Sequence, residues 1–171
     1  EVQDIGDMLT TLEKVIEEAG NDMAAGTPIS SFGKRLDADF EFANKVLEHL
    51  KSHDYSINFL TKTLLSLSLT NLDYAIDQSE EFIQENASTT VGYAILALGQ
   101  MDYKDNNQLL TKAIKLICSY QHQGQEQHIQ ALIIKSLLEI SKNKVDSYEK
   151  IKEKITSIIK YNSYEASSIH T

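Results

Sequence analysis

Apolar residues recur every three or four positions along most of the chain, and this spacing predicts α-helices. The stretch 88–120 shows the pattern most clearly, as two apolar helical segments joined by a polar turn. The first segment, Thr90 to Met101, is apolar almost all round, so we expect it to be buried. Gly92 and Gly99 lie on nearly one face of it. Because glycine disfavours a helix by about 1 kcal/mol relative to alanine, the pair indicates that another helix approaches closely. A glycine surface facing a ligand is the alternative.

The same periodicity divides the chain into about eight helices and two irregular segments. Residues 1–19 are predicted to form an N-terminal amphipathic helix. Residues 20–35 hold three of the seven glycines and the only proline, which predicts a loop or hinge. Residues 36–161 are interpreted as one helical-repeat domain, and residues 162–171 lack a pattern and are expected to fray. The run 65–69 alternates like a strand, but no partner strand is visible, so we interpret it as helix.

The spacing of the predicted helices is regular. Their starts fall near residues 37, 55, 71, 88, 107, 125 and 146. Alternate helices therefore recur about every 34 to 40 residues, which is typical of a repeat made from two helices and short turns. One hairpin of this kind cannot bury its own apolar face, so stacked neighbours must supply the core. The sequence thus predicts an all-α fold of antiparallel helical hairpins, stacked as a right-handed α-solenoid or as an irregular helical bundle.

Part of this pattern resembles a known family of repeats. Residues 71–142 are similar to two consecutive tetratricopeptide-type units. Leu98-Gly99 resembles the large-small pair of that family's first helix, while Ala75 and Ala113 resemble the small residue of its second helix. A HEAT-like array is the related alternative. The resemblance implies a concave surface that binds a protein or a peptide, and it implies no particular site residue.

The charge is strongly acidic and unevenly placed. The net charge is −9; residues 1–103 carry 18 acidic and 6 basic residues, while residues 104–171 carry 7 and 10. Most of this surface would repel a phosphate backbone, so nucleic acid is not expected as a partner. The single arginine and the lack of tryptophan remove the usual phosphate clamps and the strongest stacking platform. The acidic helices favour a basic protein or peptide, with a candidate partner surface of Asp37, Asp39, Glu41, Asp77, Glu80 and Glu81.

Residues with the potential for chemistry are few. Cys118 is the only cysteine, which excludes an intrachain disulfide, and its apolar neighbours favour a buried structural thiol. His49 and His53 lie one helical turn apart, the spacing that lets two imidazoles share a metal ion. Exposed histidines near a helix end are the alternative. No convincing catalytic constellation is present, so we predict that the protein is not an enzyme and needs no cofactor.

These observations favour a non-catalytic helical-repeat domain that mediates protein–protein interaction. The alternatives are a regulatory or sensor arm of a multidomain NTPase-type protein, and a helical-bundle metal protein or enzyme. The chain begins at Glu1 rather than methionine, which favours a domain of a larger protein whose other domains are also possible partners. The longest mainly apolar run, 57–69, is too short for a membrane span. Use of a single cysteine favours a reducing, cytoplasmic setting.

Overall fold

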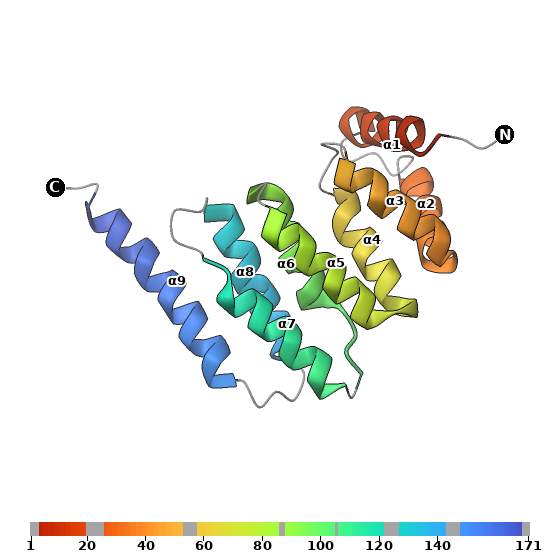
Figure 1. Cartoon of the computed structure of the whole chain (residues 1–171). Helices are drawn as coiled ribbons and strands as arrows, with labels where there is room; N and C mark the ends of the chain where they lie inside the picture. Colours follow the sequence, from red (N-terminus) through yellow and green to blue (C-terminus); the bar gives the residue numbers. More distant parts are fainter. Residues whose placement is uncertain are drawn as a thin grey trace.

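Nine α-helices make up the architecture that the structure, a computed structural model, describes (Figure 1). The described residues are 4–19, 26–52, 58–85, 88–104, 106–121, 127–142 and 148–168, and no strand occurs among them. The all-α prediction is therefore confirmed. The helices are α1 (Ile5–Ala19), α2 (Gly26–Ala38), α3 (Phe40–Ser52), α4 (Asn58–Thr70), α5 (Leu72–Glu85), α6 (Ser88–Gln100), α7 (Asn107–Ser119), α8 (Gln127–Ile140) and α9 (Tyr148–Ser168).

The helices alternate between two layers (Figure 1). α2, α4, α6 and α8 pack against one another in that order and form what we call the even layer. α3, α5, α7 and α9 lie over it as the odd layer, with α1 resting on α3. Contacts within the even layer are more extensive than those between α5, α7 and α9. The groove described below crosses three helices of this odd layer, α5, α7 and α9.

Helix α6 lies at the centre of the fold because nothing in its sequence resists burial. It contains no charged residue, and it packs against α4, α5, α7 and α8. Its closest neighbour is α8. A Cβ atom added at Gly99 would lie 2.5 Å from the Cα atom of Ser136, and one added at Gly92 would lie 2.8 Å from the Cδ1 atom of Ile129. The predicted close approach of another helix is therefore confirmed, and that helix is α8.

A short ordered turn joins α6 to α7. The Tyr103 side chain is 1% exposed, and its hydroxyl donates a hydrogen bond of 2.5 Å to the Leu98 carbonyl, one of the carbonyls left without a partner at the end of α6. Lys104 has a φ of 48°, and the Asp102 carboxylate accepts a bond from its backbone N–H. Asn106 then caps α7 by accepting a bond from the Leu109 N–H. Both helix ends are thus fixed by side chains of the turn.

The predicted loop over residues 20–35 is wrong for its second half. Residues 26–35 belong to α2, while residues 20–25 lie outside the described part of the chain. Pro28 is compatible with this helix because it lies in the first turn, where no backbone N–H is needed. Phe32 anchors the helix in the core, with its ring edge-on to that of Phe59 at 5.5 Å. Tertiary burial of an aromatic residue therefore outweighs the local glycine and proline signals.

The predicted frayed tail needs a similar correction. α9 continues to Ser168, so residues 162–168 are helical, and residues 169–171 lie outside the described part. No glycine or proline interrupts this helix, and an established helix extends at little cost even without an apolar stripe. Among the described residues, no helix combines the length and the apolar character that crossing a membrane requires.

Candidate functional site

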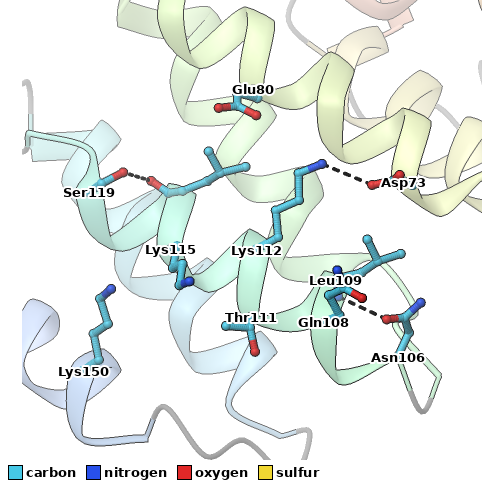
Figure 2. Close-up of a pocket in the computed structure, with 11 residues that line it drawn as sticks. Asp73, Glu80, Asn106, Gln108, Leu109, Thr111, Lys112, Lys115, Ser119 and Lys150 are labelled. Atoms are coloured by element: carbon cyan, nitrogen blue, oxygen red, sulfur yellow. Dashed lines mark hydrogen bonds and ion pairs between the residues drawn. The ribbon is translucent and has the colours of Figure 1, made fainter.

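An open groove of about 1130 Å³ crosses α5, α7 and α9 of the odd layer (Figure 2). We call it the α5–α7–α9 groove. Nine of its eleven lining residues have polar side chains. α5 contributes Asp73 and Glu80, α7 contributes Lys112 and Lys115, and α9 contributes Lys150. The groove therefore has an acidic wall on α5 and a basic wall on α7 and α9.

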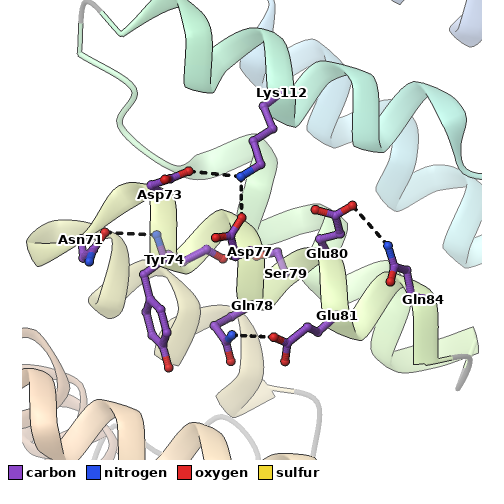
Figure 3. Close-up of polar contacts among 11 residues, drawn as sticks. Asn71, Asp73, Tyr74, Asp77, Gln78, Ser79, Glu80, Glu81, Gln84 and Lys112 are labelled. Carbon is purple, nitrogen blue, oxygen red and sulfur yellow. Dashed lines mark hydrogen bonds and ion pairs between the residues drawn. The ribbon is translucent and has the colours of Figure 1, made fainter.

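Two separate polar stripes run along α5, and one of them forms the acidic wall (Figure 3). Residues spaced by four and then three positions lie on one side of a helix, and α5 has two such sets one residue apart. One stripe points toward α7 and the groove, and the other points toward α3. The groove stripe consists of Asp73, Asp77 and Glu80, and the α3 stripe consists of Tyr74, Gln78 and Glu81.

Lys112 connects the acidic wall to α7. Its Nζ atom lies 3.1 Å from the Asp73 Oδ1 atom and is also hydrogen-bonded to the Asp77 carboxylate. The bond with Asp77 raises the pKa of Lys112 above its ordinary value, and the neighbouring Asp73 acts in the same direction. Lys112 therefore stays charged, and the two aspartates are neutralised within the protein rather than left for a partner.

Equivalent lysine bridges join two other pairs of alternate helices. In α4, Lys62 Nζ lies 2.6 Å from Asp37 Oδ1 of α2. In α3, Lys51 Nζ lies 2.6 Å from Glu81 Oε2 of α5, and this hydrogen bond lowers the pKa of Glu81. Three lysines thus tie helices that are two apart in the chain, at α2–α4, α3–α5 and α5–α7.

The six acidic residues predicted as a partner surface are divided by these contacts. Asp37, Asp77 and Glu81 are each paired with a lysine of a neighbouring helix. Asp39 caps α3, since its carboxylate accepts a hydrogen bond of 3.0 Å from the Phe42 N–H. Glu41 is exposed on α3, and only Glu80 lines the α5–α7–α9 groove. The structure therefore does not bring the six residues together as one surface.

The α7–α9 side of the groove carries no bridge of this kind among the described residues. Lys154 of α9 instead donates a hydrogen bond to the Tyr120 carbonyl at the end of α7, and burial lowers its pKa. Cys118 is half-buried nearby rather than fully buried, and burial raises the pKa of its thiol. The thiol therefore stays protonated at neutral pH, as expected of a structural cysteine.

Only one of the two histidines predicted as a metal pair lies in the described part of the chain. His49 lies partly buried on α3, and His53 lies outside the described residues, so their shared metal site stays a prediction. Within the described part of the chain, no three histidine, cysteine or acidic side chains are grouped closely enough to hold a metal ion.

The groove lysines were not predicted from the sequence. The sequence did contain a signal for them, which is the matched spacing of opposite charges. Lys112 and Lys115 are three residues apart on α7, and Asp77 and Glu80 are three residues apart on α5. Recognising it required knowledge that α5 and α7 lie side by side. No family model, curated protein or solved structure matches this chain.

The Asp37 bridge should make stability depend on acid pH. Burial raises the pKa of Asp37, but hydrogen bonds from Lys62 and Ser66 outweigh it and hold the pKa below its ordinary 3.8. A carboxyl of lowered pKa stabilises the fold above its unfolded pKa, and this contribution disappears as the pH falls through the folded pKa. Wild type should therefore exceed Asp37→Asn in unfolding free energy above about pH 5, by less than about 1 kcal/mol because solvent screens this half-exposed pair.

Urea unfolding of both proteins between pH 2 and 7 measures this difference. The exposed Glu41→Gln variant of α3 controls for the loss of one negative charge. A difference between wild type and Asp37→Asn that stays constant down to pH 2 would show that the bridge does not stabilise the fold.

Proposed function

We propose that this chain is a non-catalytic helical interaction domain that binds a peptide segment of another protein in the α5–α7–α9 groove. The observation that supports this function is the groove itself, which is open, has a volume of about 1130 Å³ and is built from three alternate helices. A surface of this form suits an elongated ligand better than a small molecule, which prefers an enclosed and mostly apolar pocket.

The size of the groove fits a short extended segment. Packed helices are about 8–10 Å apart, so a groove across three of them is roughly 16–20 Å long. An extended chain rises about 3.3 Å per residue. Five or six residues of a partner would therefore fill the groove, either from a separate protein or from another domain of a longer parent chain.

The arrangement of helices is compatible with the tetratricopeptide-like interpretation. α3, α5, α7 and α9 begin at residues 40, 72, 107 and 148, and each packs with even-layer neighbours in the manner of stacked hairpins. The proposal in full is that the chain forms a right-handed helical-repeat array, acts in the cytoplasm and binds its partner on one layer. Arrays of this kind recognise proteins on extended concave surfaces, and the proposal assigns the corresponding role to the odd layer.

The non-catalytic part of the proposal rests on the state of two reactive groups of α7, the Lys112 amine in the groove and the Cys118 thiol outside its lining. Lys112 is held by two carboxylates, which makes it a poor base or nucleophile. The thiol of Cys118 is the one cysteine nucleophile in the chain, and its raised pKa keeps it in the unreactive protonated form.

Selection from a library of random 12-residue peptides displayed on phage tests this function. The bait proteins are the wild type and the double variant Gln108→Trp/Ser119→Trp, in which two exposed groove positions of α7 become bulky. The control double variant Thr10→Trp/Gln100→Trp adds the same bulk at exposed positions outside the groove lining. Wild type and control should enrich the same peptides, and the groove variant should lose them.

Circular dichroism of all three proteins verifies that the helices are retained. Failure of wild type to enrich any peptide, or equal enrichment by the groove variant, would refute binding in this groove.

A further inference from the structure

Among the described residues, no lysine bridge continues this pattern between α7 and α9. At α2–α4, α3–α5 and α5–α7, a lysine of one helix meets a carboxylate of the other. On the α7–α9 side of the groove, the two charged lining residues are both lysines, Lys115 and Lys150. Both are exposed, and neither has an ion-pair partner among the described residues. The lining on this side of the groove therefore contains two positive charges and no carboxylate among the described residues.

Both lysines lie near the same turn of α7, Lys115 on α7 itself and Lys150 on α9. Lys115 precedes Cys118 by three residues, about one helical turn. Lys150 of α9 lies near the Cys118 sulfur, where its charge acts to lower the thiol pKa against the larger effect of burial. Two ammonium groups brought to one stretch of a groove repel each other, and a carboxylate placed between them would convert that repulsion into attraction.

The opposite wall presents the complementary charge. Glu80 follows Asp77 by about one turn on the groove stripe of α5, just as Lys115 follows Lys112 on α7. Lys112 and Asp77 are bonded to each other, whereas no ion pair joins Glu80 to Lys115. The Glu80 carboxylate accepts only a 3.2 Å bond from Gln84 among the described residues. Figure 2 places Glu80 on the α5 wall, with Lys115 and Lys150 on the other walls.

We propose that the α5–α7–α9 groove selects a mixed-charge peptide segment, in which an aspartate or glutamate binds Lys115 and Lys150 and a nearby lysine or arginine binds Glu80. This proposal rests on the proposed function and adds the chemistry of the partner. Charge complementarity of this kind fixes the register and direction of a bound segment. A nucleic-acid strand fits poorly, because its continuous negative charge would also run along the α5 wall.

The sequences enriched from the same peptide library test the proposal. Peptides selected on wild type should be rich in Asp or Glu with a Lys or Arg a few residues away. The most enriched peptide is then synthesised with fluorescein, and its affinity is measured by fluorescence anisotropy. Binding should weaken about tenfold or more for Lys115→Glu/Lys150→Glu, and also for Glu80→Lys. The control Lys45→Glu/Lys135→Glu makes the same charge change as the first variant at exposed positions outside the groove lining and should bind as wild type does.

A second part of the experiment reverses the charge of the peptide's acidic residue. Replacing its acidic residue with lysine should abolish binding to wild type and restore at least part of the affinity for Lys115→Glu/Lys150→Glu. That rescue would support direct pairing, since a variant that merely misfolded could not gain a ligand.

The outcomes separate the two proposals. Peptides that are lost in the bulky groove variant but show no charge preference would overturn the mixed-charge assignment and leave the binding function intact. If wild type enriches no peptide, both proposals fall. Tighter binding of fluorescein-labelled oligothymidylate than of the selected peptide would overturn the assignment in favour of a general anion site.

Discussion

Replacing Gly99 with alanine should lower the free energy of unfolding by about 2 kcal/mol, although the same change stabilises an ordinary helix by about 1 kcal/mol. The new Cβ atom would lie 2.5 Å from the Cα and 2.9 Å from the carbonyl oxygen of Ser136. Because these are backbone atoms, no change of rotamer relieves the clash, and α6 and α8 must move apart along their interface. Urea unfolding, followed by circular dichroism, measures the change.

The other glycines provide a graded control for this prediction. A Cβ atom at Gly92 meets the side-chain ends of Ile129 and Leu132, which can move, so Gly92→Ala should cost less. A Cβ atom at Gly26 meets nothing within 4 Å, and Gly26→Ala should leave stability within about 0.5 kcal/mol of wild type. If Gly99→Ala proves as stable as Gly26→Ala, then α6 and α8 do not pack as closely as described.

Truncating Leu98 to alanine should have an equal or larger effect, a loss of about 2–5 kcal/mol. Its side chain is fully buried in α6, where the neighbouring helices α4, α5 and α8 limit how far the space can collapse. The loss combines the transfer energy of the removed methyl groups with the cost of the remaining cavity. Urea unfolding at neutral pH gives its size.

Leu69 is the matched control for this truncation. It is also a leucine in a helix, but its side chain is 62% exposed on α4. Leu69→Ala should therefore change stability by less than about 0.5 kcal/mol. Similar losses for the two truncations would contradict the burial of α6 at the centre of the core.

Periodicity predicted the most buried parts of the fold well and the less buried parts poorly. α6 was predicted with ends that differ little from the observed Ser88 and Gln100, because a long uncharged apolar segment has few alternatives in water. α2 was missed because only Phe32 and Leu36 of its apolar residues are buried, while glycine and proline suggested a loop. Their burial depends on α3 and α4, which local sequence does not reveal.

The groove was less predictable than the helices for a related reason. Its acidic wall was partly anticipated, since Asp77 and Glu80 were among the predicted partner residues. Their different roles follow from the position of Lys112, which lies 35 residues beyond Asp77 in the chain and meets it only in the folded protein. Charge composition indicates how much acid a surface has, but tertiary contacts decide which carboxylates remain for a partner.

The two layers are held by a different balance of forces, and this has a mechanical consequence for the domain. Lysine bridges occur in both layers, at α2–α4 in the even layer and at α3–α5 and α5–α7 in the odd layer, but helix–helix contact is far more extensive in the even layer. The even layer is joined by extensive apolar packing, closest where α6 meets α8, which salt does not weaken. The odd layer carries partly exposed lysine bridges, whose attraction is screened at high ionic strength. When the stack of helices bends, the even layer should therefore keep its length while the odd layer lengthens or shortens. The ionic strength of the solution then adjusts the width of the α5–α7–α9 groove, while the packing of the core stays unchanged.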